Sequence, residues 1–259
     1  VSPSYMEELQ QAANGLESLL SHENQKCVGI LNGIDADVWN PETDEFITKN
    51  YSAKNIQTGK TANKKWLCKE FGFSASKPLF AFIGRLVLEK GADLLPEVFE
   101  KILSKKECNI LVLGSGNPEV EDSLKALKKK HKGVYNTFIG YDEKLSHIIY
   151  AGADFLLMPS RVEPCGLNQL YSLRYGTIPV VRSIGGLKDT VIDIEDGGFG
   201  FSHEEASGDN ILQTLNRAIA FYNDKPAFKK TRKHIMSIDH SWNVSAQQYI
   251  DLYNSLKSD

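Results

Sequence analysis

Short apolar segments alternate with longer amphipathic segments along most of this 259-residue chain, and this alternation limits the folds open to it more than any other feature. Apolar runs bounded by turn residues are typical of buried strands, and apolar positions at helical spacing indicate helices. Strands that alternate with helices favour an α/β fold with a doubly wound, Rossmann-like parallel sheet. We expect strands at 27–31, 79–83, 109–113, 135–139, 154–158 and 178–181, and helices near 4–20, 61–71, 92–104, 119–131, 144–151, 166–175, 188–194, 207–223, 226–236 and 242–257.

The composition is that of an ordinary globular domain, because 41% hydrophobic and 24% charged residues are enough to form a full core. A net charge of −3 argues against a nucleic-acid partner, since such proteins are normally basic. Two lysine-rich stretches, 128–132 and 229–233, are interpreted as exposed helix faces. No apolar run approaches the ~18 residues of a membrane span, and the first residues do not form a signal peptide. We expect a soluble, cytoplasmic protein without a membrane partner.

The cysteines are widely spaced and include no Cys-x-x-Cys pair, which fits neither a zinc site nor a secreted disulfide framework. We therefore expect no metal. Cys165 differs from the others because it lies near a predicted helix start, where the pKa of a thiol can fall. A small residue that fills a tight turn is still favoured over a nucleophile at this position. Four histidines without metal-like spacing are interpreted as structural or surface residues: His147, His203, His234 and His240.

The segment from Ser160 to Tyr171 follows one predicted strand and opens a predicted helix. Open parallel sheets bind ligands at the carboxyl ends of their strands. Free N–H groups at the helix start favour a phosphate or sugar oxygen, and Glu163 beside them can accept hydrogen bonds from hydroxyls. The residues alone leave an alternative open, in which Glu163 only caps the helix.

A second predicted strand runs into the loop Gly84-Arg85-Leu86-Val87-Leu88-Glu89-Lys90-Gly91. Gly84 lets the backbone approach a ligand closely, and Arg85 and Lys90 can converge on a diphosphate as a planar fork and a point charge. Loop cations are usually solvated, so the pair alone is weak support for a site. Together with the Glu163 loop at a second strand end, the pair indicates an oxyanion site.

These motifs resemble those of the bacterial glycogen synthase and plant starch synthase family, in its C-terminal, nucleotide-sugar-binding lobe. They follow the family's order over almost the whole chain. The matching residues are Val1-Ser2-Pro3-Ser4-Tyr5, Leu31-Asn32-Gly33-Ile34-Asp35, Trp39-Asn40-Pro41, Gly84-Arg85-Leu86, Lys90-Gly91, Gly114-Ser115-Gly116-Asn117-Pro118, Ile139-Gly140-Tyr141, Pro159-Ser160-Arg161, Glu163-Pro164-Cys165-Gly166-Leu167 and Gly185-Gly186-Leu187-Lys188-Asp189-Thr190-Val191.

The resemblance implies the C-terminal half of a two-lobed, GT-B type glycosyltransferase. Residues 1–25 would be the end of the N-terminal lobe and a linker helix, 26–240 the nucleotide-sugar-binding domain, and 241–259 a C-terminal helix that returns to the N-terminal lobe. The implied reaction is retaining transfer of glucose from ADP-glucose, or UDP-glucose, to the non-reducing end of an α-1,4-glucan, without a metal or other cofactor. The implied partners are this donor, the glucan acceptor and the N-terminal lobe of the same protein.

The family's N-terminal Lys-x-Gly-Gly loop and its catalytic histidine have no counterpart in this sequence. We therefore expect the chain to be inactive alone. A module that binds a nucleotide or dinucleotide without chemistry is the alternative function.

The resemblance also implies roles for single residues. Arg85 and Lys90 would bind the diphosphate and stabilise it as it leaves, and Glu163 would hold the glucose hydroxyls, so these three are the expected catalytic residues. Tyr141 would pack on the adenine ring. The other expected substrate-binding positions are Gly84, Gly114, Gly116, Asn168 and the N–H groups of Cys165, Gly166 and Leu167.

Two positions depart from the patterns of relatives. Tyr171 stands where broader relatives carry a second glutamate, and it is shared by glycogen and starch synthases, which favours this family. Asn168 replaces the threonine usual in the bacterial enzymes, but an amide still donates and accepts hydrogen bonds. Gly114-Ser115-Gly116 looks like a phosphate loop, although it lacks the third glycine of a dinucleotide fingerprint.

Overall fold

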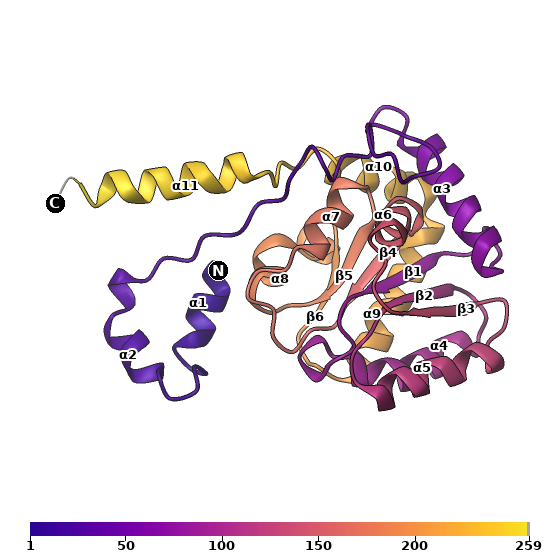
Figure 1. The fold of residues 1–259 in the computed structure, drawn as a ribbon, viewed down its shortest axis with the longest axis horizontal. Coiled ribbons are helices and arrows are strands. Elements are labelled where there is room, and N and C mark those ends of the chain that lie inside the picture. The colour runs from indigo at the N-terminus through magenta and orange to yellow at the C-terminus, as the bar shows by residue number, and fades with distance from the viewer. Residues whose placement is uncertain (258–259) are drawn as a thin grey trace.

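The computed structural model describes residues 1–257 and contains a parallel sheet between two layers of helices (Figure 1). The strands lie in the order β3-β2-β1-β4-β5-β6, and every neighbouring pair is parallel. The predicted doubly wound, Rossmann-like fold is therefore confirmed. The strands are β1 Leu79–Ile83, β2 Asn109–Gly114, β3 Tyr135–Ile139, β4 Phe155–Met158, β5 Ile178–Arg182 and β6 Phe201–His203.

Helices cover both faces of the sheet (Figure 1). One buried cluster joins the sheet to α4, α5, α9 and α10, and a second joins it to α3, α6 and α8. The helices are α1 Pro3–Leu9, α2 Glu17–His22, α3 Ile56–Phe71, α4 Leu95–Leu103, α5 Pro118–Lys130, α6 Glu143–Gly152, α7 Asn168–Arg174, α8 Gly185–Thr190, α9 Gly208–Asn223, α10 Lys225–Ile235 and α11 Trp242–Ser255.

Strand β1 shows why the sheet needs both layers. Phe80 and Phe82 belong to the first cluster, and Leu79 and Ala81 to the second. Successive side chains of a strand point to opposite faces, so a strand covered on both sides is apolar at every position. This explains why the sequence of β1 is a continuous apolar run.

Two expectations at the N-terminus are wrong. The stretch 27–31 is not a strand, and Gly29 within it packs on the start of α1, where an added Cβ would lie 2.5 Å from the backbone of Pro3. The stretch 4–20 is not one helix, because Asn14 and Gly15 have φ values of 52° and 97° and separate α1 from α2. Left-handed backbone of this kind ends a helix.

Two differences occur after β5. The helix expected at 188–194 begins earlier, as α8 at Gly185, and ends at Thr190. Glycine disfavours helix interiors, so the helix was predicted to start after Gly185 and Gly186. No strand was expected at β6, which is short and lies at the edge of the sheet.

Buried charges fix the amino-terminal ends of the strands. Oδ2 of Asp154, just before β4, accepts hydrogen bonds from Lys64 Nζ at 2.6 Å and from the Leu79 N–H at 2.8 Å, and Oδ1 accepts from Arg232 at 2.8 Å. Burial opposes ionisation of Asp154, but Lys64 and Arg232 hold its pKa below the usual value. Lys229, Lys230 and Lys233 are exposed, as expected for a helix face. Arg232 is only 6% exposed, so the interpretation of 229–233 as an exposed face is wrong for this residue.

Both ends of the chain extend away from the sheet on the same side (Figure 1). They cross where Ile34 and Ser241 form a parallel bridge. An added Cβ at Gly33 would lie 2.4 Å from the nitrogen of Trp242, so only glycine fits at the crossing. Among the described residues, no helix has both the length and the apolar character to span a bilayer.

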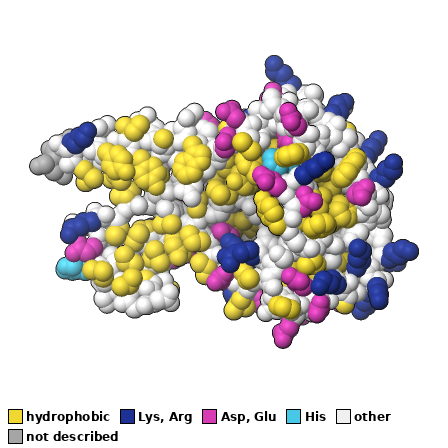
Figure 2. Space-filling model, in the orientation of Figure 1, with side chains coloured by type: hydrophobic (Ala, Val, Ile, Leu, Met, Phe, Trp, Pro, Cys, Tyr) yellow, Lys and Arg dark blue, Asp and Glu magenta, His cyan; other side chains and the backbone are white. Residues whose placement is uncertain are grey.

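Figure 2 shows hydrophobic side chains gathered along α11 and on the segment that carries α2, which face one another across a gap. Large apolar side chains on these segments are substantially exposed to solvent: Leu16, Leu19, Val28, Trp242, Ile250, Tyr253 and Leu256.

We expect Asp154→Asn to lower the free energy of unfolding by about 3–5 kcal/mol, because it leaves two buried cations without a carboxylate. Urea unfolding followed by circular dichroism measures this loss. Asp122→Asn, at an exposed position on α5, is the matched control and should change stability by less than about 0.5 kcal/mol. A loss below about 1 kcal/mol for Asp154→Asn would contradict the structural role.

The same variant should alter acid unfolding. Because the pKa of Asp154 is lowered by folding, its stabilisation is complete above the unfolded value of about 3.9 and is lost as the pH falls below it. Asp154→Asn therefore should lose less stability than the wild type between about pH 5 and pH 2.

Candidate active site

The strand order reverses next to β1. β2 and β3 lie on one side of β1, whereas β4, β5 and β6 lie on the other. The loops that follow β1 and β4 therefore leave the sheet in opposite directions and open a crevice at the carboxyl ends of the strands. These loops, 84–91 and 159–167, carry the candidate catalytic residues.

A buried ion pair joins the two loops. Nζ of Lys90 lies 2.8 Å from Oε1 and 2.6 Å from Oε2 of Glu163, and the hydroxyl of Ser160 donates to Oε2 at 2.9 Å. Glu163 is 5% exposed, and the Lys90 side chain is 24% exposed. α7 begins only at Asn168, and no side chain caps its N-terminus. Glu163 is therefore not a helix cap, and the predicted alternative is wrong.

The backbones of the two loops are also in direct contact. The carbonyl oxygen of Glu89 accepts hydrogen bonds from the N–H groups of Arg161 and Val162, at 2.7 and 3.2 Å. Gly91 has a φ of 66°, and an added Cβ there would lie 2.3 Å from the carbonyl oxygen of Pro159. Glycine is needed at this position both for the left-handed conformation and for the space.

The Glu163 loop is held from behind by the start of α8. The N–H of Gly186 donates to the Glu163 carbonyl at 2.9 Å. Added Cβ atoms on Gly185 and Gly186 would lie 2.1 and 2.0 Å from the carbonyl oxygens of Glu163 and Cys165. The absence of a Cβ at these two glycines therefore lets α8 pack closely against the loop.

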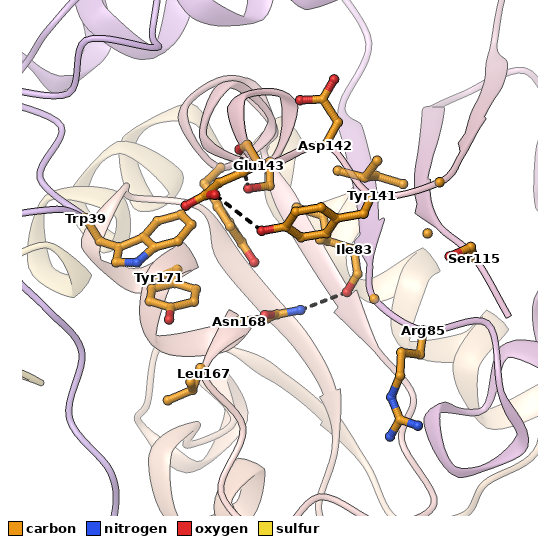
Figure 3. A pocket seen from close by; sticks show the side chains of 16 residues that line it. Trp39, Ile83, Arg85, Ser115, Tyr141, Asp142, Glu143, Leu167, Asn168 and Tyr171 are labelled. Carbon is orange, nitrogen blue, oxygen red and sulfur yellow. Dashed lines mark hydrogen bonds between the residues drawn. The ribbon is translucent and has the colours of Figure 1, made fainter.

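A cavity of about 410 Å³ lies beside the ion pair, at the ends of β1, β2 and β3 (Figure 3). A smaller cavity of about 140 Å³ contains Lys90 and Glu163, and the two cavities share Ile83, Gly84 and Asn168 in their walls. The site is thus one continuous depression with an ion pair at one end and aromatic side chains at the other.

Aromatic rings form the wall opposite Tyr141 (Figure 3). Trp39 is stacked between His147 and Tyr171, with ring centroids 3.9 Å away on each side. His147 Nδ1 lies 2.8 Å from Asp44 Oδ2, which also accepts a hydrogen bond from Tyr175. Burial opposes ionisation of Asp44, but the His147 and Tyr175 hydrogen bonds hold its pKa below the usual value. The stack is therefore anchored to a buried polar network.

Two of the predicted site residues are largely exposed. Tyr141 is 83% exposed, follows Gly140, and its hydroxyl lies 3.4 Å from Glu143. The Arg85 side chain is 68% exposed and lies 3.5 Å from Glu89. In Figure 3 its guanidinium points away from Tyr141 and Trp39. The structure thus places Arg85 at the rim of the large cavity, while Lys90 is engaged by Glu163.

Asn168, Gly114 and Gly116 have structural partners of their own. The Asn168 amide donates to the Ile83 carbonyl at 2.8 Å and so ties α7 to the end of β1. Added Cβ atoms on Gly114 and Gly116 would lie 2.0 and 2.5 Å from the carbonyl oxygens of Gly84 and Leu86. Gly114 lines the large cavity, but Gly116 lines neither cavity of the site.

Cys165 is 6% exposed, and its sulfur accepts a hydrogen bond from the Asn32 N–H at 3.3 Å. Burial raises the pKa of its thiol, so the lowered pKa considered from the sequence is wrong. Within the described part of the chain, the N–H groups of Cys165, Gly166 and Leu167 have no hydrogen-bond acceptor. Leu167 lines both cavities of the site, whereas Cys165 and Gly166 line neither.

No role was predicted for Trp39, His147 or Asp44. Trp39 was noted only as part of a family motif, and the histidine was interpreted as structural. The spacing of Tyr171 and Tyr175 by one helical turn was a usable signal, because it places both rings on one face of α7. The residues of the 35–55 segment could not be placed by any local pattern.

The fold defines the class of this protein: it is a doubly wound, Rossmann-like domain with a polar crevice at the switch point of its sheet. The family model for glycosyl transferases group 1 matches residues 65–232. The chain belongs to this family.

Within the family the chain is similar to glycogen and starch synthases. It is 54% identical over 256 residues to a glycogen synthase of Flavobacterium johnsoniae, covering 98% of this chain and 54% of that protein. It is 41% identical over 265 residues to glycogen synthase 2 of Agrobacterium fabrum, covering 99% and 52%. The chain spans about half the length of the curated relatives it matches.

A solved structure supports the same placement. The catalytic domain of starch synthase IV from Arabidopsis thaliana, bound to ADP and acarbose, superposes with a TM-score of 0.92 at 38% identity, covering 100% of this chain and 55% of that one. The expected resemblance to the C-terminal lobe of this family is confirmed.

We expect Gly91→Ala to lower the free energy of unfolding by about 3 kcal/mol, since it combines left-handed strain with a clash against the carbonyl of Pro159. Gly72→Ala is the matched control, because Gly72 has a similar φ of 74° with nothing within 4 Å of an added Cβ. The control should lose only about 1 kcal/mol in the same urea unfolding experiment. Equal losses in the two variants would mean that the close packing of Gly91 against the carbonyl of Pro159 does not contribute to stability, which would contradict the prediction.

Proposed function

We propose that this chain is the donor-binding half of a retaining glucosyltransferase that extends an α-1,4-glucan from ADP-glucose or UDP-glucose. The observation that carries the proposal is the Lys90–Glu163 pair at the switch point of the sheet. It puts a cation suited to a diphosphate in contact with a carboxylate suited to sugar hydroxyls. The similarity to a starch synthase solved with ADP and acarbose supports the same ligand class.

The bound donor would redistribute the contacts of the ion pair. We propose that Lys90 turns part of its ammonium toward the diphosphate, and that Arg85 swings from the rim to complete a two-cation clamp. Glu163 then accepts hydrogen bonds from the glucose hydroxyls. The free N–H groups of residues 165–167 face the sugar or the distal phosphate. Gly84 and Gly114 let the ligand approach the strand ends closely.

The large cavity would hold the nucleoside. Tyr141 is exposed at its edge and can pack on the base, while the stacked Trp39 and Tyr171 form the opposite wall. A ring that is already stacked on two others does not need to be ordered when the ligand arrives. Preorganisation of this kind lowers the entropic cost of binding.

The proposed chemistry is electrostatic. Negative charge grows on the diphosphate as the bond to glucose breaks, and Arg85 and Lys90 would stabilise this charge without proton transfer. The two cations do the work that a metal ion does in other phosphate sites, so the proposed transfer needs no metal.

We further propose that acceptor binding and glucan elongation need the part of the relatives that this chain does not span. The exposed apolar side chains of α2 and α11 would then contact that N-terminal lobe. Residues 26–240 would form the donor domain between these two contacting segments. We place the protein in the cytoplasm, where its four free cysteines stay reduced.

We expect ADP to bind saturably in calorimetric titration, and Lys90→Ala to weaken it at least about tenfold, because a cation facing the diphosphate is lost. Glu163→Gln should leave ADP binding unchanged or tighter, since Lys90 is released. It should, however, remove any extra affinity for ADP-glucose over ADP. Lys128→Ala, at an exposed position on α5, is the control and should bind both ligands like the wild type.

The same titration distinguishes the proposed glucosyltransferase from the alternative function, a dinucleotide-binding module. The strand order is also that of dinucleotide-binding domains, so NAD is the appropriate competitor. Tighter binding of NAD than of ADP, or indifference of ADP binding to Lys90→Ala, would move the assignment to that module.

We expect no incorporation of labelled glucose from ADP-glucose into glycogen by this chain alone. Elongation should appear when the N-terminal half of a relative is supplied in trans. That half would dock on the apolar faces of α2 and α11 and supply the part that we propose is needed for acceptor binding. Turnover by the chain alone would contradict the proposed division of labour between the two halves.

A further inference from the structure

A basic cavity lies at the end of the sheet opposite the crevice. It has a volume of about 210 Å³ and is lined mainly by α3, α10 and the start of β4. α3 and α10 pack against one another beside the sheet (Figure 1). Asp154 stands at its floor before β4, whereas Ser160 and Glu163 follow the other end of the same strand. A ligand here would not overlap the nucleotide crevice.

The lining is strongly positive although the chain as a whole carries a net charge of −3. Five lysines and one arginine line the cavity, and the carboxylate among them is Asp154. They come from helical positions one or two turns apart, which bring them to one face of each helix. The cationic residues are Lys60, Lys64, Lys65, Lys225, Lys229 and Arg232.

The single carboxylate is already shared. Lys64 and Arg232 both bind Asp154, as an ion pair on each side. Lys60 is bound by the Tyr150 carbonyl and the Thr177 hydroxyl instead. Burial, together with the positive Arg232 and Lys64, holds the pKa of Lys60 well below its usual value.

Three cations are left over. In the described residues, Lys65, Lys225 and Lys229 form no ion pair with a carboxylate. Nζ of Lys225 lies 3.3 Å from the centre of the Tyr222 ring and donates to the Tyr222 carbonyl at 2.8 Å, which fixes its position at the cavity. Burial lowers the pKa of Lys225, and the positive charges of Lys64, Arg232 and Lys229 lower it further. The cations repel one another.

Two buried donors also lack acceptors. Nε of Arg232 and Nε2 of Gln57, both from residues that line the cavity, have no hydrogen-bond partner in residues 1–257. Unsatisfied buried donors are rare in native proteins and indicate a group that the protein binds. An anion in the cavity would offset the excess of positive charge and could also accept from the unused donors.

We propose that this basic cavity binds a small, multiply charged oxyanion of phosphate or phosphate-ester chemistry. Lys65, Lys225 and Lys229 would supply the charge, and the cavity has room for roughly seven waters, enough for a phosphoryl group and a small attached group. The unpaired lysines and the unused donors take no part in the proposed glucosyl transfer, so the two proposals can be tested separately. Its position at the start of β4 links it to the crevice through that strand.

The test is calorimetric titration of the ADP-saturated chain with inorganic phosphate and with pyrophosphate, in low-salt buffer free of phosphate, so that the crevice is already filled. We expect saturable binding that the double variant Lys65→Gln/Lys229→Gln weakens at least about tenfold. Both lysines are exposed and lack carboxylate partners, so the variant should fold like the wild type. The matched control is Lys128→Gln/Lys129→Gln on α5, which carries the same change of charge far from the cavity and should alter binding by less than about twofold.

Binding in the crevice is the main competing outcome, and two measurements separate it. Pyrophosphate should still bind to protein saturated with ADP, and ADP-saturated Lys90→Ala should bind it like the ADP-saturated wild type. A loss in Lys90→Ala instead, or competition with ADP, would assign the anion to the crevice and overturn the proposal. Equal weakening of pyrophosphate binding in the two double variants would show that only the net charge of the protein matters, and this would contradict the proposal. The absence of saturable binding would also refute the proposal.

A thermal melt supplies a second readout. With saturating ADP present, pyrophosphate should further raise the melting temperature of the wild type and of the α5 control, because a ligand that binds only the folded state stabilises it. The rise should be clearly smaller for Lys65→Gln/Lys229→Gln at the same pyrophosphate concentration, because this variant binds the anion more weakly. A rise of equal size in all three proteins would contradict the basic cavity as the site.

Discussion

The position of β1 between β2 and β4 is the constraint on which the rest of the structure depends. Parallel pairing fixes β1 beside both strands, and the chain must leave β1 in one direction and β4 in the other. The two loops therefore meet only at this point, and the ion pair of Lys90 and Glu163 can form only across it. At the other end of the same strands, Asp154 fixes where β1 and β4 begin.

Local sequence patterns were sufficient for the strands and for the two loops of the site. The continuous apolar runs of β1 and β4 reflect burial on both faces, and each is followed at once by charged loop residues. The patterns failed where the reason is a contact between distant segments. The stretch 27–31 is as apolar as a strand, but its partner is the backbone near Pro3 rather than a sheet edge. Arg232 belongs to a lysine-rich stretch, yet a carboxylate 78 residues away draws it into the interior.

The glycines show the same limit within the site. Read from the sequence, Gly114 and Gly116 indicate a loop that lets a phosphate approach. In the structure they let the loop after β1 lie against the end of β2, and Gly91 and Gly186 do the same for the loop that carries Glu163. At each of these four glycines an added Cβ would clash with a carbonyl oxygen of the neighbouring loop. The backbone of the site is therefore rigid before any ligand arrives, and adjustment is left to side chains such as Arg85 and Lys90.

The two buried carboxylates at opposite ends of β4 differ in how completely they are used. Asp154 is bound by two cations that are themselves more than nine-tenths buried and by a backbone N–H. Removal of Asp154 or of either cation would leave an unpaired charge in the interior. Glu163 is held by one cation whose side chain is a quarter exposed and by one hydroxyl, and it faces a cavity. A carboxylate has about four acceptor positions, so Glu163 can take further donors while it keeps its charge partner. The two ends of β4 therefore differ in chemistry. Asp154 is fully paired within the fold while further cations around it have no carboxylate partner, whereas Glu163 has acceptor positions left for a ligand.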